Sequence, residues 1–105
     1  MKTHKVRLEK EEIEAIKEVA LEVFGSDIMI WIFGSRTDLN KKGGDIDIYI
    51  EIKDFDIEKV AKKKIEFLIR LEDKIGEQKV DVVVSPYRCQ ERHCQEAKNT
   101  GIRIL

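Results

Sequence analysis

The chain has 105 residues, a formal net charge of −1 and 42% hydrophobic residues. This length fits one small domain over residues 1–105, and the hydrophobic content favours a folded globule over a disordered chain. The balanced charge gives no support to direct nucleic-acid binding, which normally needs an excess of Lys and Arg on one face. No apolar run is long enough to cross a bilayer, and the N-terminus lacks the apolar segment of a signal peptide. We therefore expect a soluble, cytoplasmic protein without membrane partners.

The first half of the chain predicts a helix followed by two strands. Residues 8–23 carry apolar side chains at helical spacing, and Gly25 is placed to end that helix. Residues 28–33 form a short apolar run with β-branched and aromatic members, which is typical of a buried strand. A polar, glycine-containing loop is expected around residues 40–44. Residues 45–52 have the clearest strand pattern in the chain.

The second half predicts a helix, a strand, a helix and a short terminal strand. Asp56 is placed to cap a long amphipathic helix that Gly76 ends. The expected core face of this helix consists of apolar residues at helical spacing: Ile57, Val60, Ala61, Ile65, Leu68, Leu71 and Ile75. A third strand is expected over 79–84, a last helix over roughly 88–99 and a strand over 102–105. The order of elements predicts an α/β sandwich, in which helices cover a small mixed sheet.

Cys89 and Cys94 are the two cysteines of the chain, and both fall in the last expected helix. Five residues advance a helix by about 500°, so we expect the two side chains to point in different directions. This rotation and a reducing cytosol argue against a disulfide. Cys89 and His93 share a helix face at i and i+4, but the ligands are too few for a zinc site. We expect ordinary helix residues.

Three aspartates are the candidate catalytic residues. Strand side chains alternate between two faces, so Asp45 and Asp47 project from the same face. Two carboxylates that point together repel each other, and Mg²⁺, a hard cation that takes oxygen ligands, removes the repulsion. Asp81 interrupts a run of valines, where an ionised carboxylate is costly to bury unless it is paired or bound to a cation. The alternative for Asp81 is an edge strand that exposes it to solvent.

Two aromatic residues lie on the same strands as the candidate site. Tyr49 shares the strand face of Asp47, and we expect it to be packed, with a place at the outer end of the cleft as the alternative. Trp31 is expected to belong to the core rather than to form a stacking platform for a base.

The order of these motifs closely resembles that of the minimal nucleotidyltransferase domains of the DNA polymerase β superfamily. A hydrophobic strand ends in Gly34-Ser35, residues 36–44 follow, and Asp45-Ile46-Asp47 opens the next strand. Asp81 then lies in a later strand beyond an intervening helix, where that family carries its third carboxylate. The resemblance covers essentially the whole chain.

The resemblance implies a two-metal mechanism. Asp45 and Asp47 would hold two Mg²⁺ ions that the phosphates of the nucleotide bridge. Asp81 would complete the second metal position and help to deprotonate the incoming hydroxyl.

The resemblance also implies a phosphate-binding turn. Gly34 would let the backbone approach the triphosphate of ATP closely, and Ser35 and the following amides would grip it at a helix start. Arg36 is a candidate phosphate clamp, with a solvated turn residue as the alternative. Asp38 departs from the family pattern by placing a carboxylate near the expected triphosphate.

Minimal members of this family resemble antitoxins that are encoded beside a helical HEPN-type ribonuclease toxin, and some modify a tyrosine of that toxin. The resemblance therefore implies transfer of AMP from ATP to a hydroxyl of a toxin partner, in a hetero-oligomer. A second possibility is a binding module that neutralises the toxin by contact alone, which the Asp38 departure favours. A third is a non-enzymatic metal-binding domain.

Overall fold

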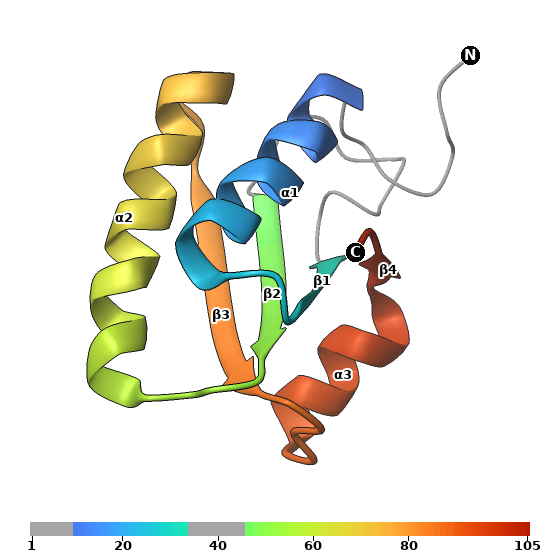
Figure 1. Ribbon diagram of the computed structural model, residues 1–105. Coiled ribbons are helices and arrows are strands. Elements are labelled where there is room, and N and C mark those ends of the chain that lie inside the picture. The colour runs from blue at the N-terminus through green and yellow to red at the C-terminus, as the bar shows by residue number, and fades with distance from the viewer. Residues whose placement is uncertain (1–9, 34–45) are drawn as a thin grey trace.

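A computed structural model of the chain describes residues 10–33 and 46–105, and shows helices on both sides of a four-stranded sheet (Figure 1). The elements are α1 (Lys10–Phe24), β1 (Ile28–Phe33), β2 (Ile46–Ile52), α2 (Ile57–Ile75), β3 (Val80–Pro86), α3 (Arg92–Thr100) and β4 (Ile102–Arg103). The strand order is β3-β2-β1-β4. The β2–β3 pair is parallel and the other two pairs are antiparallel, which confirms the predicted α/β fold with a mixed sheet.

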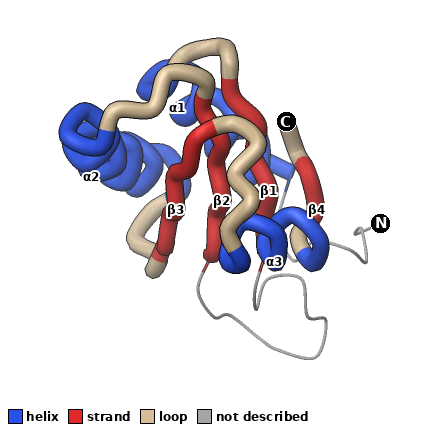
Figure 2. Tube along the Cα trace, turned by 90° about the horizontal axis from the view of Figure 1, so that it is seen from below, coloured by secondary structure: helices blue, strands red, loops and turns tan. Residues whose placement is uncertain are grey.

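The sheet separates two hydrophobic cores, because successive side chains of a strand point to opposite faces. The isoleucines of β1 and β2 fill one face and pack with α1 and α2 into the main core. The opposite face carries Trp31 and Tyr49, which pack with Cys94 and Ala97 of α3 into a smaller cluster. Figure 2 shows α1 and α2 on one side of the sheet and α3 on the other. The expected assignment of Trp31 to the core is confirmed, since its exposure is 8%.

The ends of the first two helices follow the predicted capping residues. Asp56 Oδ1 accepts hydrogen bonds from the backbone N–H groups of Glu58 and Lys59, at 3.0 and 3.3 Å. Gly25 and Gly76 end α1 and α2 with φ angles of 94° and 86°. This left-handed region is costly for residues that carry a Cβ atom, so glycine is favoured at both positions.

The predicted core face of α2 is wrong in part. Val60, Phe67 and Leu71 are the buried residues of the helix. Ile57 and Ile65 are instead exposed, at 69% and 61%. The large ring of Phe67 fills the space over the sheet, and the helix is turned so that the row Ile57, Ala61, Ile65 and Ile69 faces outward. The predicted core face and the observed buried face of α2 both have helical spacing, so the spacing alone could not distinguish them.

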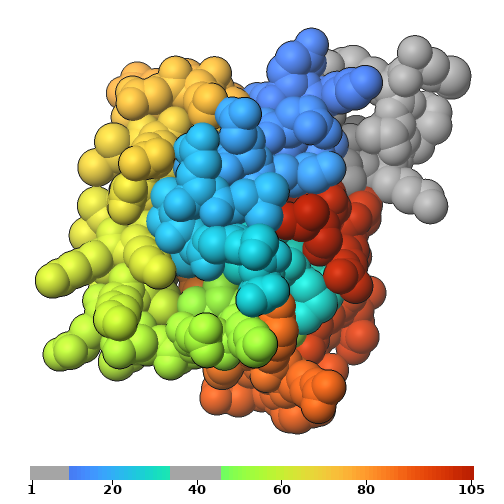
Figure 3. Space-filling view, viewed as in Figure 1, coloured from blue at the N-terminus to red at the C-terminus, as the bar shows by residue number. Residues whose placement is uncertain are grey.

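The helices of the main core also contact each other. The rings of Phe24 and Phe67 lie 5.8 Å apart between their centroids. Lys74 Nζ of α2 lies 2.6 Å from Glu18 Oε1 of α1. Figure 3 shows the surfaces of the two helices meeting over this side of the molecule. Within the described part of the chain, neither these helices nor α3 has the length and apolar character needed to cross a membrane.

The last helix begins later than predicted. The strand β3 continues through Ser85 to Pro86, and α3 starts only at Arg92. Between them, Arg88 takes a φ angle of 61°, which turns the chain back over the sheet. The N–H of Tyr87 still donates to Ile52 O at 3.1 Å, so the end of β3 is held on β2 before the turn.

Candidate active site

Two of the predicted aspartates meet at one end of the sheet. In the parallel β2–β3 pair, Asp47 is the direct register partner of Asp81. Paired residues of neighbouring strands point to the same face, and neighbouring strands lie about 4.8 Å apart. Asp47 is half-buried. Asp81 is exposed on β3, an edge strand, which is the placement that the alternative for this residue predicted. The strands therefore hold two carboxylates together at the surface, an arrangement of oxygen donors that suits a divalent cation.

The other predicted site residues lie outside the described part of the chain. These are Gly34, Ser35, Arg36 and Asp45, together with Asp38 of the intervening loop. Their predicted roles in binding phosphate and metal stay predictions. The described strands fix the positions of the residues on either side of this segment. It follows Phe33, the register partner of Asp47, and precedes Ile46, the register partner of Val80.

A cavity of about 260 Å³ lies on the same face of the sheet as the two aspartates. Its sheet side is formed by Phe33, Tyr49 and Val83. Tyr49 and Val83 are the next residues on this face beyond the Asp47–Asp81 pair, and Phe33 is the register partner of Asp47. Its other side is formed by α3, through His93, Glu96 and Ala97. A whole ligand site normally measures about 300–1,000 Å³, so this cavity has room for one part of a ligand, such as an aromatic ring.

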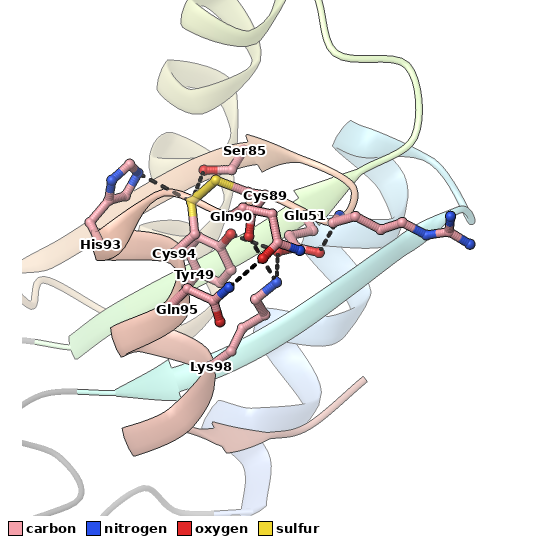
Figure 4. Close-up of polar contacts among 10 residues, drawn as sticks. Tyr49, Glu51, Ser85, Cys89, Gln90, His93, Cys94, Gln95 and Lys98 are labelled. Carbon is pink, nitrogen blue, oxygen red and sulfur yellow. Dashed lines mark hydrogen bonds and ion pairs between the residues drawn. A yellow bond between two sulfur atoms is a disulfide. The ribbon is translucent and has the colours of Figure 1, made fainter.

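A buried polar network supports the inner wall of this cavity (Figure 4). Glu51 is 1% exposed, and its carboxylate accepts a hydrogen bond from Tyr49 Oη at 2.7 Å. It also accepts one from the backbone N–H of Arg88 at 3.2 Å, and Lys98 Nζ of α3 lies 2.8 Å away. Burial, and then the hydrogen bond to Glu51, raise the pKa of Tyr49 well above its usual value. Tyr49 is thus a packed strand residue, as predicted, and a neutral one.

Glu51 was not predicted as a structural residue of the site. The alternation of β2 places it on the face of Asp47 and Tyr49, which is a signal that the sequence does carry. Its partner Lys98 comes from α3, far along the chain, and periodicity gives no information on that pairing. A buried glutamate near the end of an isoleucine-rich strand is costly without a partner, so it indicates that a cation lies opposite.

The prediction against a disulfide is wrong. Cys89 and Cys94 form one, with their Cα atoms 5.9 Å apart. The rotation argument assumed that both residues belong to a helix, whereas Cys89 lies in the turn that precedes α3. The positive φ angle of Arg88 directs this turn back toward the first turn of the helix. Cys89 and His93 consequently do not share a helix face, although the side chains of His93 and both cysteines gather at the same place.

Comparison with known proteins adds one finding to this geometry. The nucleotidyltransferase domain family matches residues 13–104. The chain belongs to this family. No curated protein sequence matches the chain. Membership assigns it the general activity of nucleotidyl transfer, for which such domains use a nucleoside triphosphate and a divalent metal ion.

The family assignment agrees with the placement of the carboxylates in this nucleotidyltransferase domain. The matched range includes both Asp47 and Asp81. Their oxygen donors fit Mg²⁺ better than a softer metal, because hard cations prefer carboxylate ligands. The side chain of Asp81 is also accessible from the surface, because the residue is exposed.

Proposed function

We propose that this domain transfers AMP from ATP to a hydroxyl of a partner protein, and that the partner is a HEPN-type ribonuclease toxin which the modification silences. The observation that supports this proposal best is the direct register pairing of Asp47 and Asp81 beside the cavity under α3. Carboxylates and an adjoining apolar cavity together provide the two requirements of the reaction: a site for metal-bound phosphates and a place for part of a substrate.

In the proposed reaction the acceptor hydroxyl attacks the α-phosphorus of ATP. A new P–O bond forms, the bond to the bridging oxygen of the β-phosphate breaks, and pyrophosphate leaves. Asp81 accepts the proton of the hydroxyl, for which its exposed carboxylate is accessible. Asp47, with the predicted ligand Asp45, would hold Mg²⁺, which when bound supplies charge neutralisation at the attacking and leaving oxygens.

The cavity is the proposed place for the aromatic side chain of an acceptor tyrosine. Phe33 and Tyr49 provide aromatic surface against which a ring packs. The phenol of Tyr49 already donates to Glu51, so it is held in place and does not compete with the acceptor hydroxyl. The cavity adjoins the aspartates on one face of the sheet, which would bring the acceptor oxygen toward the metal ligands.

The test is incubation of the purified chain with ATP, Mg²⁺ and the protein encoded by the neighbouring gene, followed by intact-mass measurement of that protein. We expect a gain of one adenylate. Asp81→Asn should abolish the gain, whereas Asp73→Asn, a matched change at an exposed aspartate of α2, should leave it intact. If the mass of that protein does not increase with any nucleoside triphosphate, the proposed transfer is refuted.

A second candidate function is neutralisation of the toxin by contact alone. The observation that favours it is the outward row of α2, where Ile57, Ile65 and Ile69 are 58–69% exposed. Exposed apolar side chains grouped on one helix are typical of surfaces that bind another protein. This candidate predicts that Asp47→Asn combined with Asp81→Asn leaves neutralisation unchanged. The enzymatic proposal predicts that the same double variant still binds the toxin but no longer neutralises it.

A further inference from the structure

Three potential metal ligands gather at the start of α3, away from the aspartates. The sulfur atoms of Cys89 and Cys94 and a ring nitrogen of His93 all lie within 4.8 Å of one another. We propose that reduction of the Cys89–Cys94 disulfide converts this group into a binding site for a thiophilic divalent cation such as Zn²⁺. Thiolate and imidazole are the ligands that Zn²⁺ prefers, whereas Mg²⁺ requires oxygen.

The distances in this group fit a tetrahedral ion. His93 Nε2 lies 3.3 Å from Cys94 Sγ. Zinc bonds of about 2.1 Å to nitrogen and 2.3 Å to sulfur, at the tetrahedral angle, place these two atoms about 3.6 Å apart. The Cα atoms of the two cysteines are 5.9 Å apart, so side-chain rotation alone separates the sulfur atoms once the disulfide opens. No rearrangement of the turn or of α3 is needed.

The surroundings of the three ligands also resemble those of a metal site. A histidine that binds a metal usually directs its other ring nitrogen to a carboxylate, which fixes the ring. Here His93 Nδ1 lies 3.8 Å from Glu91 Oε1, while Nε2 faces the sulfur. Ser85 Oγ lies 3.4 Å from Cys94 Sγ and is placed to donate a hydrogen bond to a thiolate (Figure 4).

Burial indicates what kind of site this would be. Cys94 is fully buried and Cys89 is 9% exposed, whereas His93 is exposed. The ion would therefore have protein on the side of the two sulfur atoms and water on the side of the imidazole. Three protein ligands with one water molecule is the arrangement of an open zinc site rather than of a closed structural one.

The disulfide and the metal exclude each other. Breaking the S–S bond takes two electrons and two protons and gives two thiols. Two small thiols supply both and leave as their own disulfide, whereas a phosphine supplies the electrons and becomes the phosphine oxide, with the oxygen and the two protons coming from water. The cation then displaces the two thiol protons and binds both thiolates. Oxidation would release the ion, so the site would be filled only in a reducing environment. This inference concerns residues other than the carboxylates and does not rest on the proposed transfer of AMP.

The test is a Co²⁺ titration of the chain after reduction with a phosphine and removal of the phosphine without oxygen. We expect one equivalent of Co²⁺ to give thiolate-to-cobalt absorption and tetrahedral d–d bands, and Zn²⁺ to abolish both. Cys89→Ser, Cys94→Ser and His93→Gln should each weaken binding at least tenfold. His4→Gln changes the other histidine of the sequence and serves as the matched control, with binding unchanged.

The oxidised wild-type chain is a second control, because it keeps all three residues and the fold but has no free thiol. It should give no cobalt absorption, and circular dichroism of each variant checks its folding. Absence of thiolate-to-cobalt absorption in the reduced wild-type chain would overturn the inference. An affinity that His93→Gln leaves unchanged would also overturn it, since the ion would then be bound by the sulfur atoms alone.

Discussion

Removing the ammonium group of Lys98 should destabilise the fold far more than removing a surface charge. Lys98 Nζ lies 2.8 Å from Glu51 Oε2, and the side chain of Glu51 is 2% exposed. In Lys98→Met the carboxylate would stay buried without its counter-charge, which typically costs about 3–5 kcal/mol. Two donors to Glu51 remain, from Tyr49 and from the backbone of Arg88, so we expect the lower end, about 3 kcal/mol.

The measurement is urea unfolding followed by far-ultraviolet circular dichroism, with the disulfide intact. The midpoint should fall while the m-value stays constant. Combining Glu51→Gln with Lys98→Met should recover more than half of the loss, because a neutral amide needs no counter-charge. As a control, Arg70→Met breaks two half-exposed ion pairs, with Glu66 and Glu22, and should cost less than about 1 kcal/mol.

Either of two results would refute this reasoning. A loss of less than about 1 kcal/mol in Lys98→Met would mean that the pair behaves like a surface ion pair. A double variant as unstable as the single one would mean that the loss comes from the packing of the lysine side chain, and not from the charge left at Glu51.

Three further outcomes are expected. The free energy of unfolding should fall by up to about 1.4 kcal/mol per pH unit above pH 10, because the unfolded chain releases the proton of Tyr49 near pH 10.0 while the folded chain, with its raised pKa, keeps it. In a Tyr87→Phe background, phenolate absorbance should appear only with unfolding, and its appearance in the folded chain would contradict this. Gly101→Ala should cost about 1–3 kcal/mol in thermal unfolding, since the added Cβ would lie 2.5 Å from Ala97 O and 2.9 Å from a carbonyl oxygen of β1; an unchanged midpoint would show that α3 shifts freely. Asp81→Asn should slow nucleotidyl transfer about 100-fold or more without lowering the unfolding midpoint, as its side chain is exposed; full activity would exclude it from the reaction.

Much of the fold could be predicted because short, local patterns determine it. The apolar run of β1 and the alternation in β2 specify strands whatever surrounds them, and Asp56 satisfies N–H groups two and three residues away. The orientation of α2 depends instead on which side chain fills the space above the sheet. Phe67 does so, and its partner Phe24 belongs to another helix. The start of α3 depends on the backbone of Arg88, a residue type without a strong turn preference.

The candidate site divides in the same way. Alternation alone predicted that Asp47 lies on the polar face of its strand. The apolar neighbours of Asp81 did not distinguish a site residue from a solvent-facing one, because β3 is an edge strand that exposes it. Their direct pairing depends on the register of two parallel strands, which are joined by the whole length of α2. A crossover of that length does not fix a register by itself. The pairing of Glu51 with Lys98 could likewise not be predicted from the sequence, because the two residues meet only through the packing of α3.

The alternation of β2 limits the insertions and deletions that this fold can accept. Substitutions act on one face of the strand at a time. Insertion of a single residue within β2, between Ile46 and Asp47, would exchange the two faces for the rest of the strand, turning Asp47 into the main core and Ile48 toward α3. That one event would bury the charge of Asp47 and remove a predicted metal ligand. Length variation among relatives should therefore be confined to the loops that flank β2, and any change within the strand should come in steps of two residues.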